Sequence, residues 1–501
     1  MADLLELARR QFGRLSGAEL KLLQTATAGE CDGCDRILAF DPLNDPAEAD
    51  AWGDDRKIRA SLIRWACITG QASEEVLPFG LHAHSANIVG PLDLFFASVR
   101  FPMSFLQCRL GQIDLRHATV PALILSGSLI ERLNADGITV RDSVSLDVGF
   151  STSEVRLIAA QIGGSLTCIA AKLRNSSEPT LRADRISVKG DVDLRDGFSS
   201  DGEIRIRDAQ IAGNLDCTGG EFGIVNFERT KVGGVLFWRG VRKSEYLDLS
   251  DVSTGVLTDD EDSWPAAGKL RLEGLVYQHM IAGPLSVKER LDWLQRQEEF
   301  AAQPYRQFAK TLQEIGDDEG SKAILYQLEK ERRKEERRRL VHAPFRWLSS
   351  SVEDELSEST VGYGIYPMRA VGYSIVLGLL GWLLFRRAQK IGAMAPSDKE
   401  AYAEFKKGRV PSYYPPFNPL IYSFENCIPL VKLGQDERWQ PDPNPAWISA
   451  KHSKVRPRFT KFVDFLFTPE SLRWFRWIVI GLGWLLATFF VAGITGIIRT
   501  N

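Results

Sequence analysis

The chain has 501 residues, of which 44% are hydrophobic and 25% charged, and its formal net charge is −3 at pH 7. A chain of this length exceeds one compact core, and its balanced charge gives no general case for nucleic-acid binding. Seven cysteines in so long a chain do not indicate a disulfide framework. Composition therefore excludes the small disulfide-rich and the strongly basic nucleic-acid-binding classes.

Residues 1–80 are expected to form a helical N-terminal cap, because leucines recur at helical spacing near Leu4 and apolar residues do so again over 18–26 and 56–68. The first ten residues mix acidic side chains with leucine and lack the basic start of a secretory signal. We therefore expect the N-terminal part to lie in the cytoplasm.

Cys31 and Cys34 form a CxxC pair, which in other proteins can be half of a zinc site or a redox couple. The sequence has no second CxxC to complete four ligands. We keep Cys31 and Cys34 as weak metal candidates and favour a turn with two free thiols.

One short phrase returns at intervals of roughly twenty to thirty residues across 81–284. It reads apolar, any, glycine, any, apolar, any, apolar, and copies begin at Ile88, Ile162, Val188, Ile211 and Val232; another fits if Asp142 takes the place of the glycine. The alternation is that of a short strand with one buried face, and the glycine suits a close approach between coils or a positive φ.

About two or three short strands per coil, without helical spacing, predict a β-helix over 81–284. Cys168 and Cys217 fall on the same rung of this repeat. We expect both to be small buried core residues rather than ligands or nucleophiles.

Residues 285–345 are predicted to form a helical hairpin of tetratricopeptide type and a basic juxtamembrane helix, beginning at the capping-box pair Ser286 and Glu289. Glutamates four residues from arginines offset part of the charge of the basic run. The remaining positive charge is expected to contact anionic lipid headgroups. The membrane-surface candidates are Arg332, Arg333, Lys334, Arg337, Arg338 and Arg339.

Two apolar segments, 368–385 and 477–498, are long enough to cross a bilayer, and an interfacial segment, 346–367, precedes them. Small residues four apart on both segments favour close helix packing, in a pair or an oligomer. The inter-helix segment, 386–475, is expected on the outer side, although basic residues flank it against the positive-inside tendency. Within it, 417–433 is apolar enough to lie on the membrane or re-enter it.

Residues 360–364 spell the potassium-channel filter motif Thr-Val-Gly-Tyr-Gly. No apolar span precedes this motif, and four nearby carboxylates would be costly to place in a bilayer. We favour a turn at the membrane surface and keep a channel as the alternative. The pore-related candidates are Gly362, Tyr363, Gly364 and Lys432.

Dinucleotide-binding, Walker and nucleophile-elbow patterns are absent from the sequence. We therefore expect no catalytic residue and no bound cofactor.

Several local stretches together resemble a known family; they are Gly213 to Cys217, Ser263 to Pro265, Gln303 to Tyr305, Val361 to Gly364, Phe417 to Leu420, Leu433 to Gln435 and Trp484 to Gly493. The family consists of bacterial membrane proteins often labelled membrane-associated oxidoreductases, with repeats similar to pentapeptide-repeat and bactofilin-like solenoids. Lys432 departs from the acidic residue expected at that position. The resemblance implies a solenoid, a helical cap and two membrane helices.

The fold class predicted is a mainly β solenoid (β-helix) with helical caps and a C-terminal two-helix transmembrane region. The first functional hypothesis is a scaffold anchored in the bacterial inner membrane, with its solenoid in the cytoplasm binding a protein partner or further copies of itself. The second is a channel or membrane-perturbing effector that the solenoid gates or assembles. An oxidoreductase ranks last, and nucleic acid is not an expected partner.

Overall fold

The computed structural model describes residues 4–28, 42–175, 177–281, 283, 286–339, 355, 358–360, 362–428, 431–444 and 467–495. The chain divides into two compact units, residues 1–325 and 326–501. Helix α7 (Asp318–Arg339) runs through the boundary between them. The candidate pair Cys31 and Cys34 lies outside the described residues.

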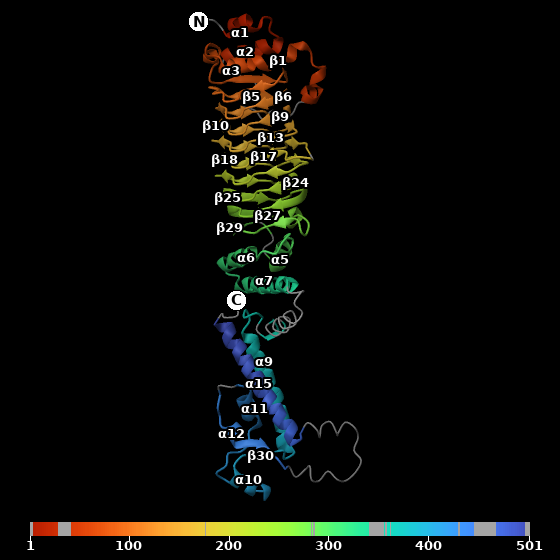
Figure 1. Cartoon of the computed structure of the whole chain (residues 1–501), viewed down its shortest axis with the longest axis vertical. Helices are drawn as coiled ribbons and strands as arrows, with labels where there is room; N and C mark the ends of the chain where they lie inside the picture. Colours follow the sequence, from red (N-terminus) through yellow and green to blue (C-terminus); the bar gives the residue numbers. More distant parts are fainter. Residues whose placement is uncertain are drawn as a thin grey trace. The chain divides into compact units, whose positions relative to one another are not determined.

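The first unit is a parallel β-solenoid of about nine turns, which confirms the predicted fold class. Its coils stack between one group of helices at the N-terminal end and another at the C-terminal end (Figure 1). The N-terminal helices are α1 (Leu4–Phe12), α2 (Gly17–Ala28), α3 (Ala60–Ile68) and α4 (Gly70–Glu75), with short 3-10 turns at Pro42–Asn44, Pro46–Ala51 and Asp54–Arg56; the C-terminal helices are α5 (Val287–Gln295) and α6 (Ala302–Glu314).

Two parallel sheets form the walls of the solenoid. The first sheet contains β1 (Lys57–Arg59), β3 (Asn87–Val89), β4 (Leu92–Asp93), β6 (Arg109–Asp114), β9 (Leu129–Asn134), β12 (Ser151–Thr152), β13 (Val155–Arg156), β16 (Lys172–Leu173), β17 (Leu181–Arg182), β20 (Ser199–Ser200), β21 (Ile204–Arg205), β24 (Glu221–Asn226), β26 (Lys243–Asp248) and β28 (Leu270–Arg271). The second contains β2 (Leu81–His84), β5 (Met103–Leu106), β7 (Thr119–Val120), β8 (Leu123–Ile124), β10 (Thr139–Val140), β11 (Val144–Ser145), β14 (Gln161–Ile162), β15 (Leu166–Thr167), β18 (Ser187–Val188), β19 (Val192–Asp193), β22 (Gln210–Ile211), β23 (Leu215–Asp216), β25 (Lys231–Trp238), β27 (Ser253–Asp259) and β29 (Val276–Met280).

A typical coil has four two-residue strands, such as β14 to β17. The repeat in the sequence predicts only two or three strands per coil. The difference arises because the chain also turns at residues in the left-handed region. On one corner these are Ala159, Arg185, Asp208 and Arg229, with φ of 57°, 59°, 55° and 57°. Such turns interrupt the strand every few residues, and the apolar alternation in the sequence does not reveal them.

The repeated glycine serves close approach between coils. Backbone bonds connect its rung from coil to coil, with Gly164 N donating to Asp142 O and Gly190 N to Gly164 O, both at 2.8 Å. A Cβ at Gly213 would lie 2.7 Å from Gly190 O, too close for any side chain. Asp142 stands on the same rung, as predicted.

Cys168 and Cys217 occupy one buried rung two coils apart, with 3% and 0% of their surface exposed. Backbone bonds place Leu194 between them, since Cys168 N donates to Asp193 O and Leu194 N to Asp216 O. Burial raises the pKa of both thiols well above the ordinary value. Both are core residues, as the repeat indicates.

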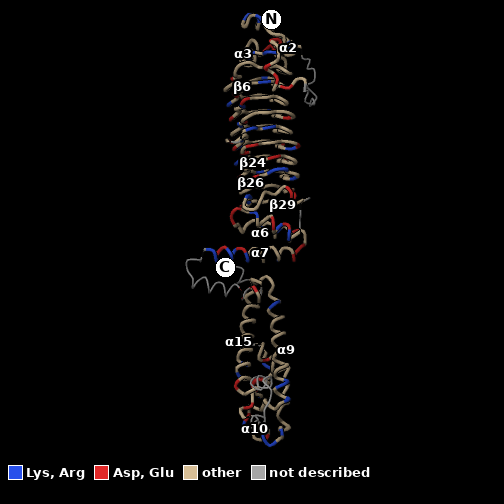
Figure 2. Tube along the Cα trace, turned by 90° about the vertical axis from the view of Figure 1, so that its right-hand side faces the viewer, with Lys and Arg blue, Asp and Glu red and all other residues tan. Residues whose placement is uncertain are grey.

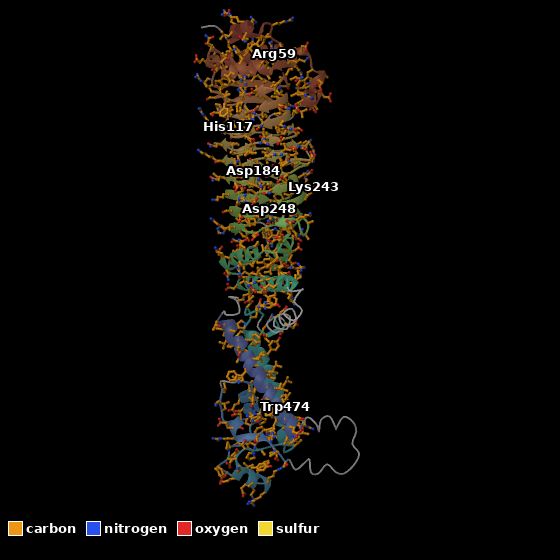
Figure 3. The ribbon with its side chains drawn as sticks, viewed as in Figure 1. Arg59, His117, Asp184, Lys243, Asp248 and Trp474 are labelled. Atoms are coloured by element: carbon orange, nitrogen blue, oxygen red, sulfur yellow. The ribbon has the colours of Figure 1, made fainter. Side chains whose placement is uncertain are left out.

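The first coil begins earlier than the expected boundary at residue 81. β1 lies inside the stretch 56–68, whose spacing of apolar residues predicts a helix throughout. This strand pairs in parallel with β3. Arg59 (Figure 3) ends this strand and holds Glu19 of α2, with Nε donating to Oε1 and Nη2 to Oε2, both at 2.7 Å. This contact comes from another part of the chain, so local periodicity did not predict the strand.

A buried ion pair connects the last coils to α5. Arg290 is fully buried, and its Nη1 and Nη2 donate to Asp259 at 2.7 and 2.5 Å. Its guanidinium lies over the rings of Trp264 and Trp293, 5.3 and 4.9 Å from their centroids. Asp259, at the start of an acidic stretch in the sequence, therefore attaches the C-terminal cap to the last coils.

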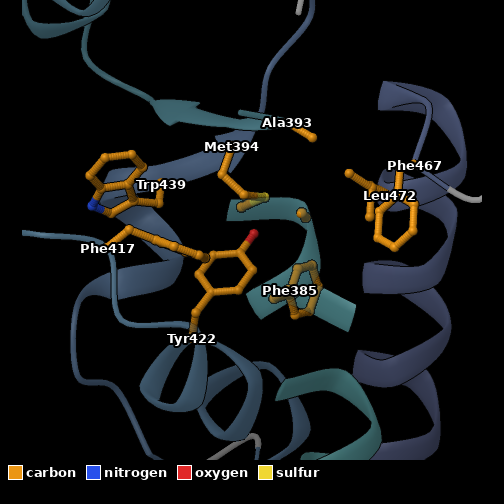
Figure 4. Packing of buried hydrophobic residues seen from close by; sticks show 9 residues of the cluster. Phe385, Ala393, Met394, Phe417, Tyr422, Trp439, Phe467 and Leu472 are labelled. Atoms are coloured by element: carbon orange, nitrogen blue, oxygen red, sulfur yellow. The ribbon is translucent and has the colours of Figure 1, made fainter. Parts of the chain in front are cut away.

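The second unit contains two long helices, α9 (Met368–Lys390) and α15 (Pro469–Ile494), and a small subdomain between them in sequence. The subdomain has β30 (Met394–Pro396) paired antiparallel with β31 (Trp439–Pro441), and the helices α10 (Lys399–Lys406), α11 (Pro419–Cys427) and α12 (Gln435–Arg438). One apolar cluster joins the subdomain to the long helices, with Phe385 of α9 packed beside Tyr422 of α11 (Figure 4).

Replacing Arg290 by Ala should lower the free energy of unfolding of the solenoid by about 3–5 kcal/mol, because Asp259 would stay buried without its partner. Urea unfolding of residues 1–325, followed by circular dichroism, measures this. Arg242→Ala is the matched control, since Arg242 and Glu221 are exposed and 3.8 Å apart, and it should change little. Equal losses in the two variants, or a mainly helical spectrum of the fragment, would contradict the account.

Candidate functional site

Helices α9 and α15 are long and apolar enough to cross a bilayer, and only 22% of the apolar window of each is buried. A core helix of a soluble protein would bury most of such a stretch. Figure 2 shows both helices tan along most of their length. Their exposed large apolar residues are Met368, Tyr373, Ile375, Val376, Leu379, Leu380 and Leu383 on α9, and Trp474, Trp477, Ile478, Leu482, Trp484, Leu485, Val491 and Ile494 on α15. This arrangement indicates membrane association.

The observed bounds differ from the predicted spans 368–385 and 477–498 at two ends. α9 continues to Lys390, and α15 begins at Pro469, where the Thr468 hydroxyl caps the helix by accepting from Ser471 N. Residues 496–498 lie outside the described part of the chain. A polar last turn on α9 and a polar first turn on α15 carry the helices beyond their apolar stretches, which hydropathy alone does not delimit.

The two helices run antiparallel. The rings of Phe385 and Phe475 are 5.8 Å apart, and a Cβ at Gly493 would lie 3.2 Å from Pro367. The end of α15 therefore lies beside the start of α9.

α11 packs between α9 and α15 along their apolar length. Ser423 Oγ donates to Gly378 O at 2.7 Å, and Cys427 Sγ to Ser374 O at 3.4 Å. These contacts lie well inside α9. At 1.5 Å per residue the nine residues of α11 span about 14 Å, roughly half of a bilayer core.

Small residues make room for this short helix. A Cβ at Gly483 of α15 would lie 2.0 Å from Cys427 O, and one at Gly378 of α9 would lie 2.6 Å from the Phe424 ring. Ser374, Gly378 and Gly483 are among the small residues whose spacing of four predicts close packing of the membrane helices, in a pair or an oligomer. In the structure these residues receive α11.

The carboxylate of Glu425 closes the loop that follows α11. Its Oε1 accepts from Leu433 N and Gly434 N, both at 2.6 Å, and its Oε2 accepts from Gln435 N at 2.8 Å and from Asp436 N at 3.2 Å. One side chain thereby satisfies four backbone donors at the start of α12. This bonding holds the return of the chain beside α11.

Arg476 of α15 extends this polar network. Its Nε donates to Asn426 Oδ1 at 2.9 Å and its Nη2 to Asp436 O at 3.2 Å. Sequence reasoning treats Arg476 only as a flanking charge and does not select Glu425 or Asn426. The available signal was a lone carboxylate in the apolar stretch 417–433.

Lys432 lies exposed in the loop that Glu425 closes. The other pore-related candidates lie at the opposite end of the long helices, because a Cβ at Gly493 would lie 3.6 Å from the Cα of Gly364. Gly493 and Arg476 are 17 residues apart on α15, which corresponds to roughly 25 Å. One chain therefore does not bring Lys432 together with Gly362, Tyr363 and Gly364.

Gly362, Tyr363 and Gly364 form a turn just before α9, with φ of 54°, 56° and 79°. Tyr363 is only 1% exposed, and its hydroxyl donates to Glu358 at 3.1 Å. The guanidinium of Arg333 on α7 lies 4.8 Å from the centre of the Tyr363 ring. The turn packs against α7 in the second unit.

Glu358 is the centre of this contact. Tyr326 Oη donates to it at 2.8 Å and Lys330 Nζ at 3.1 Å. Partial burial acts to raise the pKa of Glu358, but hydrogen bonds from Tyr326, Lys330 and Tyr363 hold that pKa below its ordinary value. Glu358 is therefore an ionised partner that joins α7 to the turn before α9.

The basic run of α7 is partly self-paired. Arg332 pairs with Glu336, Lys334 with Glu331 and Arg338 with Glu335, at 3.2, 3.4 and 3.5 Å. Arg337 lies in the same helix, and the side chain of Arg339 is outside the described part.

Among the residues that the structure describes, no group of three or more His, Cys, Asp or Glu side chains is placed to hold a metal ion.

No family model, curated protein or solved structure matches this chain. Its function is therefore inferred from its own residues.

Gly483→Ala should destabilise the second unit by about 1–3 kcal/mol, because the new methyl group would overlap Cys427 O and displace α11. Thermal unfolding of the full chain in detergent measures this. Gly481→Ala, two residues away on the same helix with nothing within 4 Å of its Cβ, is the control and should be tolerated. Equal melting temperatures for the two variants would show that α11 does not pack there.

Proposed function

We propose that the protein is a membrane-anchored scaffold whose β-solenoid presents a binding surface to another protein or to further copies of the chain. The observation that supports anchoring best is the outward-facing apolar surface of α9 and α15. Such a surface is stable in contact with lipid and costly in water. The bilayer is then the first partner of the chain.

The solenoid surface suits a protein partner. Charges of both signs alternate along it (Figure 2), and many pair between coils. Examples are Arg205 with Asp184, Arg229 with Asp208 and Arg271 with Asp248, at 2.8, 2.6 and 3.3 Å. This mixed surface lacks the single-sign field that nucleic-acid binding requires.

We further propose the bacterial inner membrane as the location, with the solenoid in the cytoplasm. The basic run on α7 supports this orientation, because cytoplasmic juxtamembrane segments are enriched in Lys and Arg. The long segment between α9 and α15 would then face the other side.

Membrane extraction and labelling test this proposal. The full chain should stay in the membrane fraction after alkaline carbonate washing. In intact cells, an impermeant thiol reagent should label Tyr413→Cys and spare Ser199→Cys. Release by carbonate would contradict anchoring, whereas the reverse labelling pattern would contradict only the orientation.

A second function, a channel built from several copies, is favoured by one observation. α11 enters between the two apolar helices and returns through the loop that Glu425 closes. Re-entrant backbone at membrane depth occurs where protein or a water-filled path covers it. Two long helices and one short helix do not enclose a pore, so conduction would require an assembly.

Ion flux into liposomes containing the full chain tests the channel. Flux by the wild type should be lost in Gly483→Ala and kept in Gly481→Ala, because only the first displaces α11.

Gly362→Ala should leave flux unchanged, since Gly362 lies in a turn outside the span, and should cost about 1 kcal/mol through its positive φ. Absence of ion flux with the wild-type protein would contradict the channel and leave the scaffold as the proposed function. If the wild type conducts potassium selectively and Gly362→Ala abolishes this flux, residues 360–364 would instead act as a potassium filter.

A further inference from the structure

A cavity of about 470 Å³ opens beside the C-terminal end of α9. This volume falls within the range of about 300–1,000 Å³ typical of ligand sites. Its walls come from α9, β30, β31, α10 and the loop 409–417. The principal lining side chains are Met394, Phe405, Val410, Tyr414, Phe417 and Trp439.

Trp439 is the centre of the aromatic wall. Its ring lies 6.4 Å from Phe405, 5.8 Å from Tyr414 and 5.3 Å from Phe417, measured between centroids. Figure 4 shows Trp439 and Phe417 on the side of the apolar cluster away from Leu472 and Phe467. The cavity therefore continues an apolar core rather than a polar surface.

Three polar side chains of the wall donate hydrogen bonds to backbone carbonyls of the protein. Trp439 Nε1 donates to Pro415 O at 3.1 Å, Gln389 Nε2 to Phe417 O at 3.3 Å, and Tyr414 Oη to Arg438 O. The described lining residues carry no formal charge. A mainly apolar, uncharged site of this kind favours an apolar ligand over a phosphate or a carboxylate.

The position of the cavity indicates the source of that ligand. Gln389 and Gly392 line it, and they lie just beyond the apolar length of α9, where a membrane helix meets the headgroup region. Val410 on its wall is 46% exposed, and the neighbouring Tyr413 is 71% exposed. Exposed aromatic residues are typical of the membrane interface. Lys390 and Arg409, which are both exposed, adjoin the lining residues Gln389 and Val410 in the sequence.

We infer that this cavity binds the acyl chain of a membrane phospholipid. The inference rests on the proposed membrane anchoring, which brings lipid to the end of α9. The aromatic wall contacts the acyl chain, and the headgroup stays outside the cavity near Lys390 and Arg409.

The test compares two substitutions on one loop. Ser412 lines the cavity, whereas Tyr413 does not, and both are exposed, so Ser412→Trp and Tyr413→Trp should fold alike. The full chain is purified in detergent with phosphatidylglycerol, and native mass spectrometry counts the lipid retained. Wild type and Tyr413→Trp should retain one lipid, and Ser412→Trp should retain about tenfold less, which corresponds to about 1.4 kcal/mol.

A second measurement does not depend on Ser412→Trp. Phosphatidylglycerol with brominated acyl chains should quench the fluorescence of the wild type more than that of Trp439→Phe, because Trp439 would contact the chain. Equal quenching would overturn the inference. Equal lipid retention by Ser412→Trp and Tyr413→Trp, with folding unchanged, would also overturn it and indicate lipid bound nonspecifically around the helices.

Different measurements test the membrane anchoring and the lipid-binding cavity. Carbonate extraction reports whether the chain is in the membrane, whereas retention in detergent reports whether the cavity holds lipid. A chain that stays in the membrane but retains no lipid overturns the cavity assignment alone. A chain that carbonate releases but that retains one lipid supports the cavity and contradicts the anchor.

Discussion

Close contact between backbones is the constraint on which both units depend. In the solenoid, each coil bonds to the next through parallel backbone pairs, and Gly213 and Gly234 lie where a Cβ would strike the preceding coil. In the second unit, Gly378 and Gly483 admit α11 in the same way. Glycine is costly for the entropy of folding, so at these points the close approach of backbones must outweigh that cost.

Charge pairs, half-buried at the N-terminal end and fully buried at the C-terminal end, join the caps to the solenoid in addition to apolar contact. Glu19 with Arg59 joins α2 to the first coil, and Asp259 with Arg290 joins the last coils to α5. An exposed sheet end would otherwise offer unpaired donors and acceptors to another chain. Bidentate arginine contacts also fix the orientation of each cap, because the guanidinium matches a carboxylate in one geometry.

The second unit combines an apolar exterior with a small polar interior. Glu425 accepts from the backbone of the returning loop, and Arg476 donates to Asn426 and to the Asp436 carbonyl in the same loop. A buried polar network of this kind is stable only when its members are paired, and it then defines one arrangement of the chain. That arrangement holds the returning loop beside α11, which packs between α9 and α15.

The sequence by itself determined the solenoid, the buried Cys168 and Cys217, and the two apolar helices, because each depends on a pattern that repeats locally or on length and hydropathy. It did not determine four strands per coil, since residues such as Ala159 adopt positive φ only within the stacked coils. Only the tertiary structure decided which side chains meet, as in Arg290 with Asp259 or Ser423 with Gly378. These partners are 31 and 45 residues apart, and where the chain returns is a property of the whole fold.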